Sequence, residues 1–370
     1  MASAQLSLID DLEHVIADKT IGDRAAILRR VTDLFVLASG ANSKLPDEQV
    51  ALFDDVMDRL LAEIGTSARV AFGQALAVVP GAPPKVIRKL ALDDAIDVAG
   101  PILAQSGQVD DLTLVESARN KSQAHLLAIS RRKTLAETVT DVLVERGDQQ
   151  VVMSTAENHG AAFSENGYLK LVQRSSSDDD LAACVWSRPE IPRQHLLELF
   201  ANASESVKLK LTKKDPRKAN IILEIVAQAS NRIQAGTREK SPSYAAAQAH
   251  VKGLHESGGL NEARLAEFAH AGKFDETAVA LSLMCDLPIT LIERALVEER
   301  SEQIIVIAKA TGLAWENVKL ILLLQEKVKN DAKHKLEQHF ETFMRLHADT
   351  AKKAIQFYRL RERATKLRRQ

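Results

Sequence analysis

VIRKLALDD at residues 86–94 and AHLLAISRR at residues 124–132 follow one pattern, a short apolar helix that ends in polar or charged residues. Residues 149–158, 181–188 and 205–211 repeat it with variations. Each copy follows a small, polar or proline residue, which is typical of a helix N-terminus. The starting residues are Pro84, Ser122, Asp148, Asp178 and Ser204, with spacings of 38, 26, 30 and 26 residues.

A second amphipathic helix is predicted between most of these copies, most clearly over residues 135–145 and 192–202, and the long first gap has room for another over residues 110–118. Residues 287–296 align with residues 313–322 at an offset of 26. A recurring two-helix unit must stack on its neighbours to bury its apolar stripe. The sequence therefore predicts an all-α fold, a HEAT-like α-solenoid of short helix pairs followed by a long C-terminal helix.

Five segments are predicted along the chain. Residues 1–64 form an acidic helical segment with 12 acidic and 6 basic residues, and residues 65–212 carry the helical repeats. Residues 213–243 comprise a helix and a linker that contains Gly236 and Pro242, and residues 244–325 form a second repeat section. Residues 326–370 are predicted to be one long basic helix, with a possible interruption near Asn330.

The composition excludes several classes of protein. The 370 residues carry a net charge of −1, so no global charge drives the chain toward nucleic acid or anionic lipid. Aromatic residues make up 4% and there are 16 glycines, which favours helix over strand. The N-terminus lacks the basic start and apolar centre of a signal peptide, and no apolar run is long enough for a membrane span. We expect a cytoplasmic protein.

No known catalytic motif is present. GxGxxG, GxxxxGKS/T and GxSxG are absent, and no strand is predicted that would present them. The histidine pairs His334/His339 and His250/His255 are five residues apart, which places them about 140° apart on a helix. Cys184 and Cys285 each lie in an apolar run, as buried thiols do. We expect no catalytic residue, no cofactor and no metal site.

DNA glycosylases built on HEAT-like arrays need aromatic walls in a basic groove. The chain has only Trp186 and Trp315, and Trp186 is predicted to pack in the core. An enzyme whose residues converge only in space is the third hypothesis for function.

Polar residues recur in the turns between predicted helices. In a solenoid such turns stack along one ridge, where arginines could bind the carboxylates of a partner. The alternative is that these side chains cap helix ends. The candidate partner-contact residues in the turns are Arg131, Arg132, Asn158, His159 and Arg188.

The C-terminal tail is strongly basic, with eight basic residues and one acidic residue in the last 20. It could complement the helix dipole, pair with an acidic partner or with the acidic N-terminal segment, or contact nucleic acid or an anionic membrane. The candidate contact residues there are Arg359, Arg361, Arg363, Lys366, Arg368 and Arg369. A second basic segment, residues 208–218, has six basic residues and one acidic residue.

Several strings together resemble one protein family. They are LALDDAIDVAGPILAQS at residues 90–106, AISRR at 128–132, NHGAAFS at 158–164, SRPEIP at 187–192 and FYRLR at 357–361. They are similar to the alphaproteobacterial DUF2336 proteins, over residues 65 to the C-terminus. The resemblance implies a helical-repeat fold and a bacterial cytoplasmic setting, and it supplies no catalytic residue.

The function predicted from the sequence is a non-catalytic cytoplasmic scaffold or regulatory adaptor for an unidentified protein partner. An acidic partner would be able to pair with the basic tail. Self-association through the C-terminal helix is a further expectation. The alternative is a nucleic-acid-associated regulator that uses residues 208–218 and 352–369.

Overall fold

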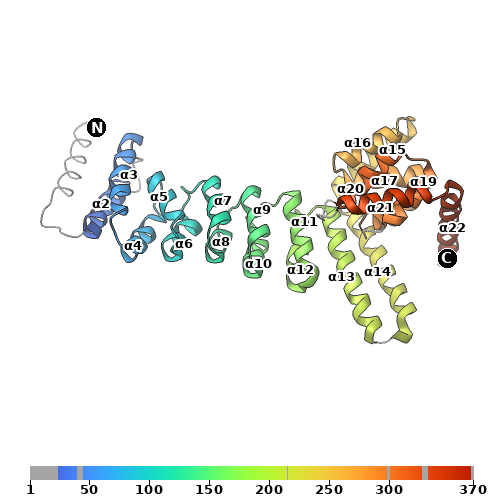
Figure 1. The fold of residues 1–370 in the computed structure, drawn as a ribbon, viewed down its shortest axis with the longest axis horizontal. Coiled ribbons are helices and arrows are strands. Elements are labelled where there is room, and N and C mark those ends of the chain that lie inside the picture. Colours follow the sequence, from blue (N-terminus) through green and yellow to red (C-terminus); the bar gives the residue numbers. More distant parts are fainter. Residues whose placement is uncertain (1–23, 40–44, 215, 298–300, 327–331, 368–370) are drawn as a thin grey trace. The chain divides into compact units, whose positions relative to one another are not determined.

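The computed structural model describes residues 24–39, 45–214, 216–297, 301–326 and 332–367. Side chains at 325, 326, 332–335 and 361–367 are outside this description. The described chain is helical throughout and contains no strand, only an isolated bridge between Leu135 and Ala161 (Figure 1). Contacts divide it into two units, residues 1–171 and 172–370.

The helices of the first unit lie in two rows. α3, α5, α7 and α9 contact one another in succession, and α4, α6, α8 and α10 do the same (Figure 1). α2 contacts α3 and α4, and all three helices belong to this unit. The helices are α2 (Arg24–Ala38), α3 (Asp47–Leu61), α4 (Thr66–Leu76), α5 (Pro84–Ala91), α6 (Ile96–Gln105), α7 (Asp111–Asn120), α8 (Gln123–Ser130), α9 (Glu137–Arg146), α10 (Gln149–Glu157) and α11 (Glu165–Arg174), the last of which crosses into the second unit.

Helices begin at four of the five predicted starting residues. Pro84 is the first residue of α5, and Ser122 is the residue before α8. The carboxylate of Asp148 accepts a hydrogen bond from the backbone N–H of Val151 at 2.9 Å, and Asp178 caps α12 in the same way. The helix predicted at residues 110–118 is α7, which Asp110 caps through Thr113.

The second unit contains longer helices and its own core. Its elements are η1 (Ser175–Ser177), α12 (Asp179–Trp186), α13 (Arg193–Lys214), η2 (Pro216–Lys218), α14 (Ala219–Glu239), α15 (Pro242–Glu256), α16 (Glu262–His270), α17 (Phe274–Cys285), α18 (Ile289–Val297), α19 (Ser301–Thr311), α20 (Trp315–Glu326), α21 (Ala332–Arg345) and α22 (Ala348–Leu367). The apolar core lies mainly among α15 to α20, with α21 and α22 packed against α19. α13 and α14 lie side by side as a long hairpin (Figure 1).

The predicted repeat start at Ser204 is wrong. Ser204 lies inside α13, which runs without a break from Arg193 to Lys214. No proline or glycine interrupts residues 193–214, so the helix that starts at Arg193 continues through the supposed fifth copy. The linker predicted around Gly236 and Pro242 is shorter in the structure. α14 continues to Glu239, and Pro242 occupies the first turn of α15, where a proline is favoured.

The prediction of a single long C-terminal helix is also wrong. α21 ends at Arg345 and α22 begins at Ala348, and the possible interruption near Asn330 lies outside the described residues. The break at Leu346 and His347 lets both helices pack on α19, which buries Phe343 of α21 and Ala351 of α22.

Trp186 does not pack in the core as predicted. Its side chain is 41% exposed at the end of α12. The ring makes a tilted contact with Phe200 of α13, with 6.3 Å between ring centroids.

Candidate interaction surfaces

Two of the predicted contact residues in the turns bind the backbone of the neighbouring helix pair. The guanidinium of Arg132 donates to the carbonyl oxygens of Leu103 at 2.7 Å and Ser106 at 2.9 Å, at the end of α6. The amide of Asn158 donates to the carbonyl oxygens of Ser130 at 2.9 Å and Arg132 at 2.7 Å, just after α8. Helix C-termini leave carbonyls without intrahelical partners, so these side chains act as caps between successive pairs.

The remaining turn residues differ in exposure. Burial lowers the pKa of Arg132, whereas its neighbour Arg131 is exposed. His159 is exposed beside Asn158. Arg188 is buried and forms an ion pair with Glu190. A partner role for Arg131 and His159 stays a prediction, and of the five turn residues these two are the exposed ones.

Capping between helix pairs also uses residues that the sequence did not single out. Arg146 at the end of α9 donates to the carbonyl oxygen of Ala118 in α7. The amide of Gln123 donates to the carbonyl oxygen of Arg146 at 2.9 Å. The only sequence signal for these bonds is a polar residue near a helix end, which is too common to identify them.

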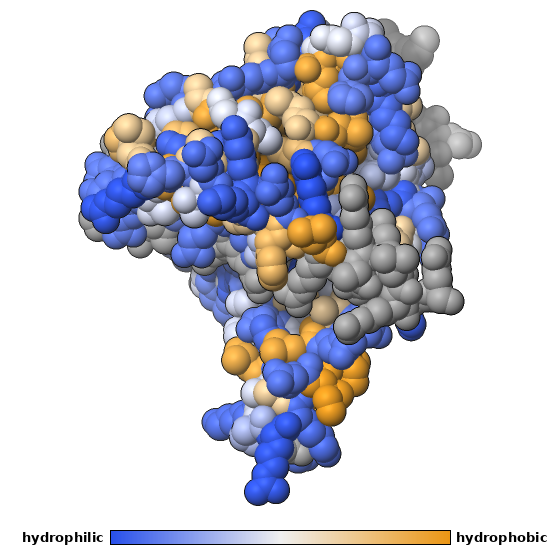
Figure 2. All heavy atoms as spheres, turned by 90° about the vertical axis from the view of Figure 1, so that its right-hand side faces the viewer, coloured by the Kyte–Doolittle hydropathy of each residue, from blue (hydrophilic) through white to orange (hydrophobic). Residues whose placement is uncertain are grey.

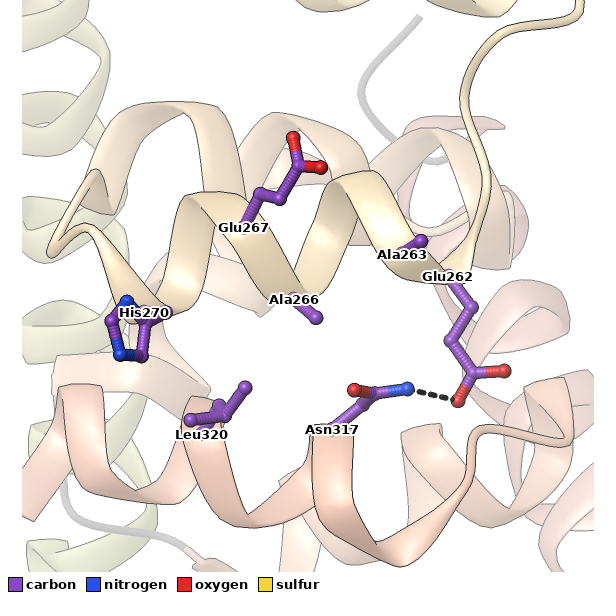
Figure 3. Close-up of a pocket in the computed structure, with 7 residues that line it drawn as sticks. All are labelled: Glu262, Ala263, Ala266, Glu267, His270, Asn317 and Leu320. Atoms are coloured by element: carbon purple, nitrogen blue, oxygen red, sulfur yellow. Dashed lines mark hydrogen bonds between the residues drawn. The ribbon is translucent and has the colours of Figure 1, made fainter.

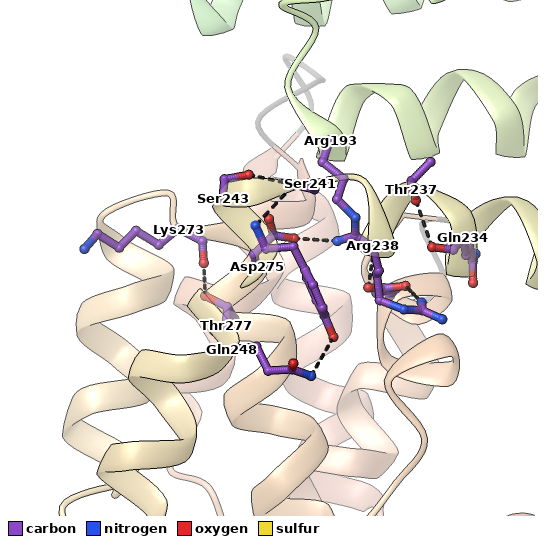
Figure 4. A network of polar contacts seen from close by, with 12 residues as sticks. Arg193, Gln234, Thr237, Arg238, Ser241, Ser243, Gln248, Lys273, Asp275 and Thr277 are labelled. Carbon is purple, nitrogen blue, oxygen red and sulfur yellow. Dashed lines mark hydrogen bonds and ion pairs between the residues drawn. The ribbon is translucent and has the colours of Figure 1, made fainter. Parts of the chain in front are cut away.

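The base of the α13–α14 hairpin is held to the rest of the second unit by a buried charge network. Arg193 of α13 donates to Asp275 of α17 and to Glu293 of α18, each at 2.5 Å, and its guanidinium lies 4.8 Å from the ring centroid of Tyr244 (Figure 4). Arg238 of α14 donates to the other carboxylate oxygen of Glu293, also at 2.5 Å. Both helices of the hairpin are therefore tied to one carboxylate.

Burial dominates the electrostatics of this network. It raises the pKa of Glu293 and of Asp275, although the adjacent guanidinium groups act in the opposite direction. Glu293 is fully buried, so its charge depends on Arg193 and Arg238 for compensation. The network fixes the hairpin base and offers no open site.

The other end of the hairpin exposes aliphatic side chains. Val207, Leu209 and Leu211 project from α13 and Ile221, Leu223 and Ile225 from α14, with exposures between 43% and 62%. Figure 2 shows apolar side chains among hydrophilic ones at the lower end of the molecule, which α13 and α14 form in Figure 1. Exposed apolar patches of this kind mark interaction sites.

Basic side chains surround these aliphatic residues. Lys213 and Lys214 at the end of α13 are exposed. Lys208 pairs with Glu205 at 2.9 Å, and Lys210 lies 3.8 Å from Asp179. The predicted basic segment thus includes the end of α13 and η2, and this end of the hairpin is apolar as well as cationic.

α22 forms a second exposed surface. Ala351 and Ile355 are buried on its inner face, and Arg359 donates to the carbonyl oxygen of Cys285 just at the end of α17. Phe357 and Leu360 are each 65% exposed. Of the predicted tail residues, Arg359 therefore caps the end of α17. Arg361, Arg363 and Lys366 belong to α22, but their side chains are outside the description. Arg368 and Arg369 lie outside the described residues.

Cys285 of α17 is a buried free thiol. Burial raises the pKa of the Cys285 thiol to about 12, so it is protonated at neutral pH and a poor nucleophile. Among the described residues, no group of three or more His, Cys, Asp or Glu side chains is placed to hold a metal ion. None of the described helices combines the length and apolarity that crossing a bilayer requires.

An open groove of about 770 Å³ lies between α16 and α20 (Figure 3). Its floor includes Ala266 and Leu320, and its rim includes Glu262 and Asn317. Glu262 accepts hydrogen bonds from the side chain of Asn317 at 2.7 Å and the backbone N–H of Ala314 at 2.5 Å, so it serves the start of α20. The bond between Glu262 and Asn317 thus connects α16 to α20 across the groove.

Comparison with known proteins gives one match. No curated protein and no solved structure matches the chain. Residues 98–356 match the family DUF2336, which is described as "Uncharacterised protein conserved in bacteria". This span includes most of the second unit and the C-terminal part of the first. The chain therefore belongs to the DUF2336 family.

Proposed function

We propose that this protein is a non-catalytic cytoplasmic scaffold or regulatory adaptor for protein partners, built on a HEAT-like array of helix pairs. The two rows of helices in the first unit support the array: successive helices in each row are in contact, and Arg132 and Asn158 cap the ends of preceding helices. Arrays of this kind bury their stripes between repeats and leave extended faces for binding.

The observation that carries the proposal is the outer face of α22. The helix is docked on α19 through Ala351 and Ile355, yet Phe357 and Leu360 are largely exposed. Lys353, Phe357 and Leu360 lie at helical spacing of four and three residues, so they share one face. An exposed aromatic ring beside an apolar residue is typical of an anchor in a protein interface.

The charge of α22 indicates the class of partner. Lys352 and Lys353 are exposed in its first half, and its second half continues with four more basic residues up to Lys366. A helix with apolar anchors in a basic setting fits an acidic protein surface. Self-association through the same face is the competing protein–protein interaction.

The test is affinity purification of the full chain from its native cells, with nuclease treatment. The wild type is compared with Phe357→Ala/Leu360→Ala, and Leu112→Ala in α7, which is 77% exposed, is the matched control. The proposal expects a protein that the wild type and the control retain after nuclease treatment and that the α22 variant loses. Capture of nucleic acid alone would favour the alternative, a regulator that uses residues 208–218 and 352–369.

Two further results would count against the adaptor. Light scattering separates self-association from a different partner, since a dimer that Phe357→Ala/Leu360→Ala converts to a monomer would identify a second copy as the ligand of α22. A rise in melting temperature with a metabolite, without any captured protein, would instead favour an unrecognised enzyme.

A further inference from the structure

The tip of the α13–α14 hairpin has no structural need for its aliphatic residues. The buried network of Arg193, Arg238 and Glu293 fixes the base, and Leu197 and Leu199 are buried there. Beyond this base, between Val207 and Ile225, six aliphatic side chains stay exposed. Leaving such side chains in water forgoes the free energy of burial, so a binding role accounts for them better than folding does.

The apolar side chains lie on more than one side of the hairpin. Val207 and Leu211 are four residues apart and share a face of α13, as Ile221 and Ile225 do on α14. Leu209 and Leu223 lie two residues from these pairs, about 200° around the helix axis. One rigid protein face covers one side of a hairpin, whereas a fluid interface can adapt to side chains on several sides.

The charge of the tip selects an anionic surface. Residues 208–218 hold six basic residues and one acidic residue, and Lys213 and Lys214 are exposed at the end of α13. Two copies of this tip packed together would bring like charges close, which disfavours a second copy as the occupant. Nucleic acid would satisfy the cations, but its phosphates would leave the six aliphatic residues uncovered.

We infer that the α13–α14 hairpin tip binds the interface of an anionic lipid bilayer. The aliphatic residues enter the boundary between headgroups and acyl chains, and the lysine side chains extend along it to the lipid phosphates. The contact is peripheral. It uses a different element from the α22 face proposed for protein partners, so either proposal can fail without the other.

Vesicle flotation tests the inference directly with the full chain. The vesicles are phosphatidylethanolamine with phosphatidylglycerol, and pure phosphatidylcholine vesicles serve as the uncharged comparison. We expect binding to the anionic vesicles that weakens with added salt, and little binding to phosphatidylcholine. Lys213→Gln/Lys214→Gln and Leu211→Ser/Ile225→Ser should each lower the association constant for the anionic vesicles by about tenfold. Because all four side chains are exposed, both variants should keep the wild-type circular dichroism spectrum.

Matched controls separate the hairpin from other surfaces. Leu112→Ser removes a leucine of α7 that is 77% exposed, and Lys352→Gln/Lys353→Gln removes the same charge from α22. Both should bind anionic vesicles as the wild type does. The inference is overturned by equal binding to both vesicle types, by unchanged binding of the hairpin variants, or by a loss confined to the α22 variant. A dimer that Leu211→Ser/Ile225→Ser dissociates would also overturn it, in favour of a second copy.

Discussion

Arg193 lies in a buried network of charged side chains in the second unit. Its guanidinium is buried, donates to Asp275 and Glu293, and lies over the ring of Tyr244. The three partners come from α17, α18 and α15, so one side chain connects the hairpin base to three other helices. Buried ion pairs add little net stability over an apolar core, but removal of one partner leaves the other charges buried without compensation.

Arg193→Met tests this dependence. The variant leaves the carboxylates of Asp275 and Glu293 buried, and Glu293 keeps its ion pair with Arg238. The expected loss is about 3 kcal/mol or more in the free energy of unfolding, measured by urea denaturation. Arg264→Met is the control, since Arg264 pairs with Glu267 on the surface at 2.6 Å and should cost about 0.5 kcal/mol. Similar losses in the two variants would contradict the role given to the network.

The same substitution predicts a pH dependence. Burial raises the pKa of Asp275 and Glu293, so the folded state binds protons more readily than the unfolded state. The protonated carboxyl groups therefore add to the stability of the folded state at acid pH, and this added stability is lost as the pH rises through their raised pKa values. Arg193→Met removes a cation that lowers both pKa values, so its destabilisation should be smaller at about pH 5 than at about pH 8. Equal losses at the two pH values would show that the carboxyls do not titrate in this range.

Sequence reasoning could not find this network. Arg193 is 82 residues from Asp275 and 100 from Glu293, and the chain has 50 acidic residues to choose from. The turn residues were more tractable, because Arg132 and Asn158 lie next to predicted helix ends. There the sequence offered two roles, capping and partner contact, and the structure shows the capping bonds.

At the scale of elements, the helix pairs of the first unit depend on side chains that cap the previous pair. Asn158→Ala removes donors to two carbonyl oxygens and the acceptor of the Gly160 N–H. The expected loss is about 2 kcal/mol in urea denaturation. His159→Ala at the exposed neighbour should stay within about 0.5 kcal/mol of the wild type. An unchanged free energy of unfolding in Asn158→Ala would show that water replaces the cap.

Gly160 permits the close contact between the α8–α9 and α10–α11 connections. A Cβ there would lie 1.8 Å from the carbonyl oxygen of Lys133, which is backbone and cannot turn away. Gly160→Ala should therefore cost about 2 kcal/mol or more, because the two connections must separate. Gly107→Ala is the control, since its Cβ would meet nothing within 4 Å. Thermal unfolding of both variants by circular dichroism measures the difference.

The limits of element prediction follow from local physics. Proline and capping residues marked α5, α8, α10 and α12 correctly, because these signals act within one turn of the chain. Ser204 is also a residue type that favours a helix start, but it lies inside α13, which continues through it. The break between α21 and α22 carries no glycine or proline. It allows both helices to pack on α19, which is a tertiary cause.

At the scale of the whole molecule, the sequence predicted an all-helical protein from its low glycine and aromatic content, and the described residues confirm this. The division at residues 171 and 172 was not predicted. It falls inside α11, where no flexible linker composition marks it, because it reflects long-range contacts. The exposed faces of the hairpin tip and α22 could not be predicted either, since their apolar residues follow the same helical spacing as core residues.

The most direct test of the adaptor is quantitative capture from native cells after nuclease treatment, with the wild type beside Phe357→Ala/Leu360→Ala and Leu112→Ala. The account predicts a protein partner recovered equally by the wild type and Leu112→Ala, and reduced about tenfold or more by loss of the two anchors on α22. Equal recovery by all three chains, or recovery of nucleic acid alone before nuclease treatment, would contradict it.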